Sequence, residues 1–225
     1  MKSEVRRESI LLAATDVFGQ YGYYGTTTDQ VAKAAGVSQP YVVRMFGTKE
    51  RLFLEVLERA LSLLIVGFRA VLAEGKHDLT ARLGAAYVDM LRQRGLLLSL
   101  MHAFVLGGDP VIGAAARRGF LEVYALLRDE AGLSPEDAKG FLEGGMLLNT
   151  LVGLRMSDEF ETSGLANELL CTVLPHKLEV LLQAGGRLLV EPAQHVGAQV
   201  DPEPLVLVHG DTSISSITTR SAFRP

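Results

Sequence analysis

The chain has 225 residues, of which 48% are hydrophobic and 21% are charged. This length suits one large domain or two small ones, with enough apolar material to form a core without disulfides or metals. A formal net charge of −4 and an isoelectric point near 5.8 exclude a protein that coats nucleic acid by bulk positive charge. Any binding to nucleic acid therefore requires a local patch.

Cysteine usage and hydropathy exclude further classes. The single cysteine, Cys171, rules out an intramolecular disulfide and any CxxC metal or redox motif. The longest uncharged run extends from Gly95 to Gly108 and falls short of the roughly 20 residues of a membrane span. Charged residues at the start interrupt the place of a signal peptide. We therefore expect a cytoplasmic protein with no membrane partner.

Helical periodicity extends along most of the chain. Ile10, Ala14 and Val17, for example, share one helical face, and similar patterns recur as far as Gly186. Pro175 is expected to kink or split the last helix. The predicted helices cover residues 4–21, 28–35, 39–45, 49–74, 79–93, 96–106, 110–131, 135–157 and 163–184. The expected fold class is all-α.

Capping signals mark several predicted helix starts. Thr27 and Gln30 have the spacing of a capping box, and Ser38 is placed to cap the next helix. Asp109 and Ser134 each precede a proline at the expected first helical position. Prolines and short polar residues crowd the chain after residue 186 without a helical pattern, so we expect residues 187–225 to form a poorly ordered tail.

The segment 27–46 has the pattern of a helix-turn-helix, in which the second helix enters a DNA major groove. Gly36 tolerates the positive φ of the turn, and the small Ala32 lets the two helices approach closely. The expected buried contacts are Val31, Ala35, Val37, Val42 and Met45. The expected outward side chains of the second helix are Gln39, Pro40, Tyr41 and Arg44.

About the first 53 residues resemble the TetR family of bacterial transcriptional repressors. The resemblance is carried by Ile10-Leu11-Leu12-Ala13-Ala14, Phe18, Gly22-Tyr23, Thr26-Thr27, Val31-Ala32, Ala34-Ala35-Gly36-Val37-Ser38, Phe46 and Thr48-Lys49-Glu50-x-Leu52-Phe53. It implies a homodimer that binds a palindromic operator and leaves it when a small molecule enters a C-terminal domain. The expected organisation is a three-helix DNA-binding domain over 1–48 and a larger helical ligand-binding and dimerisation domain over 49–186.

The resemblance also implies phosphate contacts at two helix starts. Thr27, with Thr28 beside it, matches a phosphate-contacting position where free backbone N–H groups meet an anion. Lys49, after the cap residue Thr48, matches a second phosphate clamp. Val43 stands where most relatives have a tyrosine, so the phosphate contact of that hydroxyl is missing here.

Base contacts are expected from the second helix of the motif. Gln39 can pair with adenine N6 and N7, and Arg44 with guanine O6 and N7 or with a phosphate. Pro40 can contact a thymine methyl group, and Tyr41 can add a contact from the groove side. The alternative for Tyr41 is packing, and the alternative for Arg44 is an ion pair with an acidic neighbour.

Polar residues interrupt the apolar helices of the C-terminal region. Tyr87, His102, Asn149 and Arg155 are candidates for a ligand pocket, because such pockets are mostly apolar with a few placed polar groups. Each of them can equally be a satisfied core or surface group.

The dimer surface is expected on the helices 135–157 and 163–184, by resemblance to the family. Gly144 and Gly145 allow another helix to approach closely, either from a second subunit or from the same chain.

No enzyme motif, metal-ligand spacing or cofactor signature is present, so we expect a non-enzymatic protein without cofactor or metal. Our hypothesis is a DNA-binding repressor released by a small apolar or amphipathic effector. One alternative is a regulator or activator without a small-molecule ligand. A filled C-terminal core would favour this alternative, whereas a cavity of several hundred Å³ would favour the repressor released by an effector. The other is a helical small-molecule-binding or catalytic domain with a vestigial helix-turn-helix.

Overall fold

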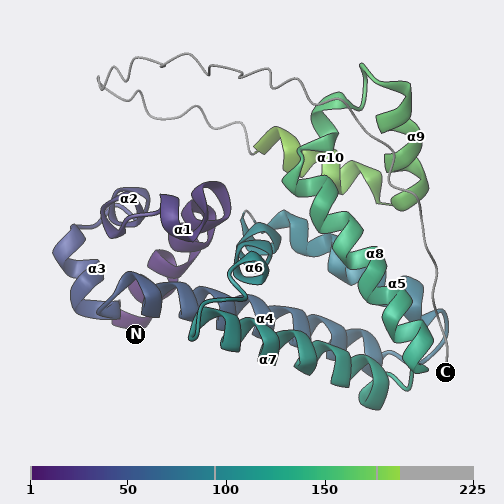
Figure 1. Ribbon diagram of the computed structural model, residues 1–225, viewed down its shortest axis with the longest axis horizontal. Coiled ribbons are helices and arrows are strands. Elements are labelled where there is room, and N and C mark those ends of the chain that lie inside the picture. The colour runs from purple at the N-terminus through teal and green to yellow at the C-terminus, as the bar shows by residue number, and fades with distance from the viewer. Residues whose placement is uncertain (1, 94, 176, 188–225) are drawn as a thin grey trace, which may run out of the picture. The chain divides into compact units, whose positions relative to one another are not determined.

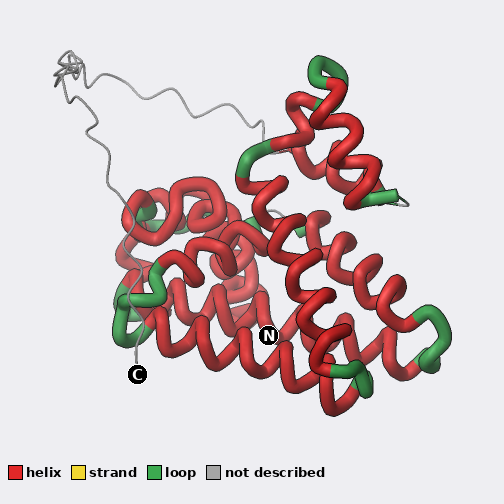
Figure 2. Tube along the Cα trace, turned by 45° about the vertical axis from the view of Figure 1, so that its right-hand side comes forward, coloured by secondary structure: helices red, strands yellow, loops and turns green. Residues whose placement is uncertain are grey.

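The computed structural model describes residues 2–93, 95–175 and 177–187. Within these ranges every regular element is a helix (Figure 2), which confirms the all-α prediction. The α-helices are α1 Lys2–Gly25, α2 Thr28–Ala34, α3 Gln39–Phe46, α4 Lys49–Ala73, α5 Leu79–Asp89, α6 Leu96–Val105, α7 Ile112–Ala125, α8 Pro135–Gly153, α9 Gly164–Val173 and α10 Leu178–Arg187. The shorter elements are the 3-10 helices η1 Met90–Arg92 and η3 Met156–Glu159 and the π-helix η2 Leu126–Glu130. Apart from Arg187, the predicted tail lies outside the described residues.

Side-chain caps begin three of the helices as the sequence predicts. The hydroxyl oxygens of Thr27, Thr48 and Ser134 each accept a hydrogen bond, at 3.1–3.2 Å, from the backbone N–H three residues later. Ser38 occupies the N-cap position of α3, but its side chain makes no capping hydrogen bond. The start of α3 is therefore shaped by the turn before it and by Pro40 in its first turn.

The predicted start of α7 at residue 110 is wrong. The Asp109 carboxylate accepts hydrogen bonds from the backbone N–H groups of Val111 and Ile112, at 2.9 and 2.8 Å. These bonds form a turn around Pro110, so the helix begins at Ile112.

The predicted end of the first helix at residue 21 and the predicted kink or split at Pro175 both correspond to interruptions of the helical conformation. Gly22 has φ 68° and ψ 177° and interrupts the helical conformation of α1, although the helix is assigned through Gly25. Pro175 lies between α9 and α10, which separate at the point where the sequence predicts a kink or a split.

The first core cluster joins the three N-terminal helices to α4. Phe18 of α1, Val31 of α2 and Val42 of α3 are fully buried with Phe53 of α4. The same cluster includes Ala103 of α6 and Ile112 of α7. The predicted boundary at residues 48 and 49 thus falls at the start of a helix whose first turns pack in the N-terminal core.

Helix α4 continues from this core along the rest of the body, where α7 packs beside it (Figure 1). Leu64 and Phe68 of α4 belong to a cluster with α5, η2 and α8, and a further cluster joins α5, α6, α8, α9 and α10. One helix therefore connects the helix-turn-helix region with the rest of the described chain.

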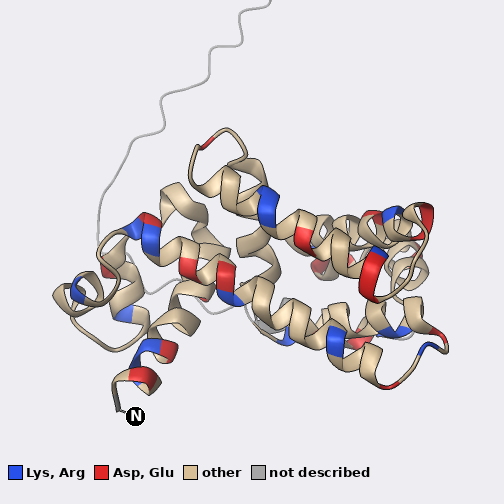
Figure 3. Cartoon of the chain, turned by 90° about the horizontal axis from the view of Figure 1, so that it is seen from below, with Lys and Arg blue, Asp and Glu red and all other residues tan. Residues whose placement is uncertain are grey.

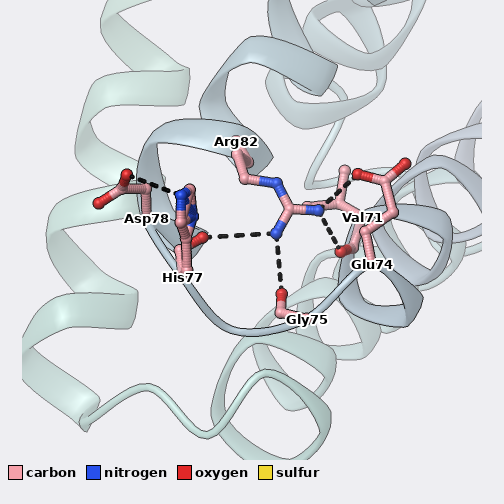
Figure 4. Close-up of polar contacts among 6 residues, drawn as sticks. All are labelled: Val71, Glu74, Gly75, His77, Asp78 and Arg82. Atoms are coloured by element: carbon pink, nitrogen blue, oxygen red, sulfur yellow. Dashed lines mark hydrogen bonds and ion pairs between the residues drawn. The ribbon is translucent and has the colours of Figure 1, made fainter.

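Arg82 of α5 closes the C-terminal end of α4 (Figure 4). Its guanidinium donates to the carbonyl oxygens of Val71 and Gly75, both at 2.8 Å, and to that of His77 at 3.4 Å. It also donates to the Glu74 carboxylate at 2.6 Å. A cation at this position satisfies carbonyl groups left free at a helix C-terminus and favours the helix dipole there. It therefore ties the end of α4 to α5.

No helix in the described ranges is long and apolar enough to cross a membrane.

Candidate nucleic-acid interface and ligand cavity

The turn between α2 and α3 has a fixed backbone geometry. Gly36 has φ 65°, and the N–H of Val37 donates to the Ala32 carbonyl at 3.0 Å. At the start of α2 the predicted capping box is complete, because the Gln30 side chain also accepts from the Thr27 N–H at 2.7 Å. The predicted buried contacts of the motif are buried or half-buried against the first core cluster: Val31, Ala35, Val37, Val42 and Met45. The turn and the shared core thus hold α3 against α2.

The outward face of α3 carries most of the residues predicted to read DNA. Gln39, Pro40 and Arg44 are exposed, whereas Tyr41 is half-buried against the core cluster. The Gln39 amide nitrogen lies 3.2 Å from the Thr28 hydroxyl, so one predicted base-reading residue touches one predicted phosphate-contacting residue. The Arg44 guanidinium lies 5.0 Å from the Tyr41 ring centroid, a cation–π contact. Arg44 has no carboxylate partner in the described part of the chain, contrary to the alternative of an ion pair.

Val43 is a further exposed residue on this face that sequence reasoning treated only as a missing tyrosine. Its side chain is 39% exposed. An exposed aliphatic residue on α3 offers an apolar contact where the family pattern places a hydroxyl.

Charge is not concentrated on one side of the body in the view of Figure 3, where basic and acidic residues alternate along the helices. On α2, Lys33 pairs with Asp29 at 2.9 Å. The exposed Arg44 of α3 is therefore a local positive charge on a surface where basic and acidic residues are mixed.

Lys49 lies at the start of α4, as predicted, but its ammonium group is engaged within the protein. Its Nζ donates to the backbone carbonyls of Tyr23 at 3.0 Å and Thr26 at 3.1 Å. The same atom lies 4.5 Å from the Tyr23 ring centroid. Burial, followed by the nearby Glu50 carboxylate, raises the pKa of the Tyr23 phenol. The hydrogen bonds from Lys49 to these two carbonyls could not be predicted from the sequence, because no sequence pattern links Lys49 to residues 23 and 26.

Replacing Lys49 by alanine is expected to lower the free energy of unfolding by about 1–3 kcal/mol, because two carbonyls lose a charged donor. Denaturant unfolding of both proteins measures the difference. Lys33→Ala is the control, because its pair with Asp29 is exposed and contributes less than about 1 kcal/mol. Equal losses of unfolding free energy in the two variants would show that the hydrogen bonds from Lys49 to the two carbonyls do not stabilise the fold.

A cavity of about 510 Å³ lies in the C-terminal part, bounded by α4, α5, α6, α7 and α8. Most of its wall is apolar, with Leu57, Leu61, Phe68, Phe104 and Phe141 among the lining residues. The cavity has the size and composition typical of small-molecule sites.

Two of the four predicted pocket residues line this cavity. Tyr87 and Asn149 meet at its wall, where the Tyr87 hydroxyl donates to Asn149 Oδ1 at 3.0 Å. Three charged residues line it as well, namely Glu58, Arg118 and Glu122. Sequence reasoning missed these three because an exposed charge on an amphipathic helix ordinarily indicates a solvated face.

His102 and Arg155 do not line the cavity. His102 Nε2 lies 3.3 Å from the Gly19 carbonyl oxygen, and the ring packs against Gly22, so this side chain contacts α1. Arg155 is exposed in a left-handed conformation, with φ 53°, and pairs with Asp158 at 2.7 Å. Their expected ligand contacts are replaced by a helix–helix contact and a surface ion pair.

The arrangement of α1, α2 and α3 defines a helix-turn-helix domain, with α3 in the position of a recognition helix. Residues 10–56 match the model of the family described as bacterial regulatory proteins, tetR family. This segment of the chain is therefore similar to the N-terminal region of TetR-family regulators.

Curated relatives match less than a third of this chain. The HTH-type transcriptional regulator RutR of Escherichia coli (strain K12) is 37% identical over 65 residues, which are 29% of this chain and 31% of that protein. The HTH-type transcriptional activator FasR of Mycolicibacterium smegmatis is 40% identical over 67 residues, 30% of this chain and 31% of that protein. The chain thus spans about a third of the length of these relatives.

The solved structures similar to this chain include the TetR family regulator PfmR from Thermus thermophilus. It has 22% sequence identity and a TM-score of 0.47, over 63% of this chain and 83% of that chain.

Proposed function

We propose that this chain is a sequence-specific, DNA-binding transcriptional regulator of the cytoplasm. The observation that carries the proposal is the helix-turn-helix, in which α3 is held on a buried core and presents Gln39, Pro40 and Arg44 outward. Base contacts would come from this face and from Tyr41. Phosphate contacts would come from Thr27, Thr28, Thr48 and Lys49 at the starts of α2 and α4. The Lys49 ammonium would then bridge the carbonyls of Tyr23 and Thr26 and a phosphate.

A homodimer through α8, α9 and α10, which correspond to the predicted ranges 135–157 and 163–184, would place two recognition helices on a palindromic operator. Exposed leucines on these helices, or directly after α8, support this surface: Leu147, Leu154, Leu165 and Leu169. A Cβ at Gly144 would meet no atom within 4 Å, so this glycine leaves room for a partner helix. Gly145 instead accommodates the Tyr87 ring of the same chain, 3.4 Å from where its Cβ would stand. We also propose a DNA-binding domain over 1–48 and a ligand-binding and dimerisation domain over 49–186.

A repressor released by an effector in the cavity is the mode of regulation that the cavity supports best. Leu100 and Phe104 of α6 line the cavity, while Ser99 and His102 of the same helix contact α1. A ligand that shifts α6 would therefore change the position of α1 and of the recognition helix. A coupling of about 1–3 kcal/mol is typical of such linkage. A filled core would have favoured the alternative of a regulator without a small-molecule ligand. Activation is the second candidate mode, because the similar protein FasR is named as a transcriptional activator.

Binding of the purified protein to the DNA that flanks its own coding region tests the proposal. Titrations at two salt concentrations, beside a scrambled duplex, are expected to show a preference of roughly a thousandfold or more for the native DNA. Compounds that fit the cavity are then screened for release of that DNA. No binding to either duplex at low salt would contradict the proposal and favour a ligand-binding protein with a vestigial helix-turn-helix.

A further inference from the structure

The polar pair in the cavity wall is incompletely hydrogen-bonded. Asn149 is only 2% exposed, and its Oδ1 accepts from the Tyr87 hydroxyl. Its amide nitrogen carries two N–H donors, and neither has an acceptor in the described part of the chain. Buried donors are ordinarily paired, because an unpaired one has lost its water without replacement. Asn149, a lining residue of the cavity, therefore has two unused donors.

The surroundings of this pair are apolar and uncharged. The Phe68 ring lies 6.5 Å from the Tyr87 ring and 5.6 Å from the Phe141 ring, between centroids. Burial raises the pKa of Tyr87 to about 12, so the phenol stays protonated and neutral near pH 7. An ion placed here would lose its hydration without gaining a counter-charge.

The charged lining residues lie farther along the cavity. Glu58 precedes Phe68 by ten residues on α4, which corresponds to about 15 Å along the helix. Arg118 and Glu122 of α7 flank Gly119, which packs against Leu61. These three side chains reach solvent, so they line the cavity where it meets the protein surface. The cavity thus has a charged side toward solvent and a neutral, donor-bearing inner wall.

From this arrangement we infer that the cavity binds a neutral, mainly apolar molecule whose carbonyl-type oxygen accepts a hydrogen bond from the Asn149 amide. The apolar part would lie among the aliphatic and aromatic side chains between α4 and α7. This inference rests on the proposed function, because it gives the chemical class of the effector for the same cavity.

Three probes with the same chain length and different head groups test the inference. Binding of 2-nonanone, nonanoate and nonylamine to the full chain, without DNA, is measured by titration calorimetry. The ketone is expected to bind at least tenfold more tightly than the anion or the amine, because only its head group is a neutral acceptor. Equal or tighter binding of either ion would overturn the inference, as would the failure of all three probes to bind.

Substitution of Asn149 locates the contact. Asn149→Leu is expected to weaken ketone binding about tenfold, the effect of one hydrogen bond. Thr150→Val is the control on the next residue of α8, because that hydroxyl is exposed and bonds only the Met146 carbonyl of its own helix. Unchanged ketone affinity in Asn149→Leu would refute the assignment.

Tyr87→Phe provides a second variant should Asn149→Leu not fold. It removes the hydroxyl that holds Asn149 Oδ1 and is expected to weaken ketone binding severalfold, whereas Tyr124→Phe, outside this cavity, leaves the affinity unchanged. Equal affinities in these two variants would overturn the inference. Failure of the proposed function is distinguishable, since a protein that binds 2-nonanone but no DNA retains the ligand class and loses the regulatory role.

Discussion

Gly95→Ala is expected to lower the free energy of unfolding by about 3 kcal/mol or more, one of the two largest effects that the structure predicts. Gly95 is the N-cap residue of α6 and has φ 70°, a conformation that costs an L side chain roughly 1–2 kcal/mol. An added Cβ would also stand 2.3 Å from the Thr15 carbonyl oxygen and 2.9 Å from the Asp16 Cα. Both neighbours are backbone atoms of α1, so relief requires the two helices to separate.

The contact that Gly95 permits is a direct approach of two backbones. A Cβ at Gly19 of α1 would stand 2.4 Å from the Gly95 Cα, so glycine is required on both sides. Ser99, one turn into α6, adds a hydrogen bond from its hydroxyl to the Thr15 carbonyl at 3.2 Å. This is the junction through which α6 would pass ligand binding to the DNA-binding domain. We therefore expect Gly95→Ala to weaken DNA binding as well as stability.

Thermal unfolding measures the effect on stability. For a chain of this size, 1 kcal/mol corresponds to roughly 2–4 °C, so the melting temperature should fall by about 6 °C or more. Gly84→Ala is the matched control, because Gly84 lies inside α5 and its Cβ would meet nothing within 4 Å. That variant should be neutral or more stable by about 0.5–1 kcal/mol. A Gly95 variant that melts with the wild type would contradict the close backbone contact.

Gln39→Ala is expected to change which base is preferred at one operator position, with a loss of about 1–3 kcal/mol of discrimination at each half-site. The residue stands at the exposed start of α3, where its amide can pair with adenine N6 and N7. In the structure its Nε2 lies 3.2 Å from the Thr28 hydroxyl, which holds the amide beside the start of α2. Titration against duplexes carrying each base at each operator position measures the change.

Two further variants separate base reading from general affinity. Lys49→Ala should weaken binding to all sequences and lower the slope of log affinity against log salt by about one, without changing base preference. Gln20→Ala makes the same change as Gln39→Ala at an exposed position of α1 and should alter neither property. If Gln39→Ala and Lys49→Ala both lost only sequence-independent affinity, Gln39 would not read a base.

The N-terminal domain could be predicted from sequence in some detail because its signals are local. The capping box of Thr27 and Gln30 and the turn at Gly36 each depend on residues a few positions apart. Capping and turn formation are short-range interactions, and apolar spacing then decides which face of each helix is buried. The error at Asp109 was also local, since an Asp-Pro pair can start a helix or form a turn.

The C-terminal site could be predicted only in part. Tyr87 and Asn149 are predicted pocket residues because ligand pockets are mostly apolar with a few placed polar groups, and the two side chains meet each other 62 positions apart in sequence. His102 and Arg155 have the same sequence signal but lie against α1 and at the surface. A polar residue within an apolar helix indicates that its side chain needs a polar partner. The packing of helices that are distant in sequence decides which group becomes that partner.

The sequence by itself determined where most helices of this protein begin and end, that two of them form a helix-turn-helix, and which face of α3 is outward. Only the tertiary structure decided that Gly95 meets the backbone of α1, that the Lys49 ammonium binds the carbonyls of Tyr23 and Thr26, and that Asn149, with unused donors, lines a cavity. The physical reason is the range of the interactions. Caps, turns and amphipathic faces arise within a few residues, while close backbone contacts and cavities arise where segments far apart in the chain meet.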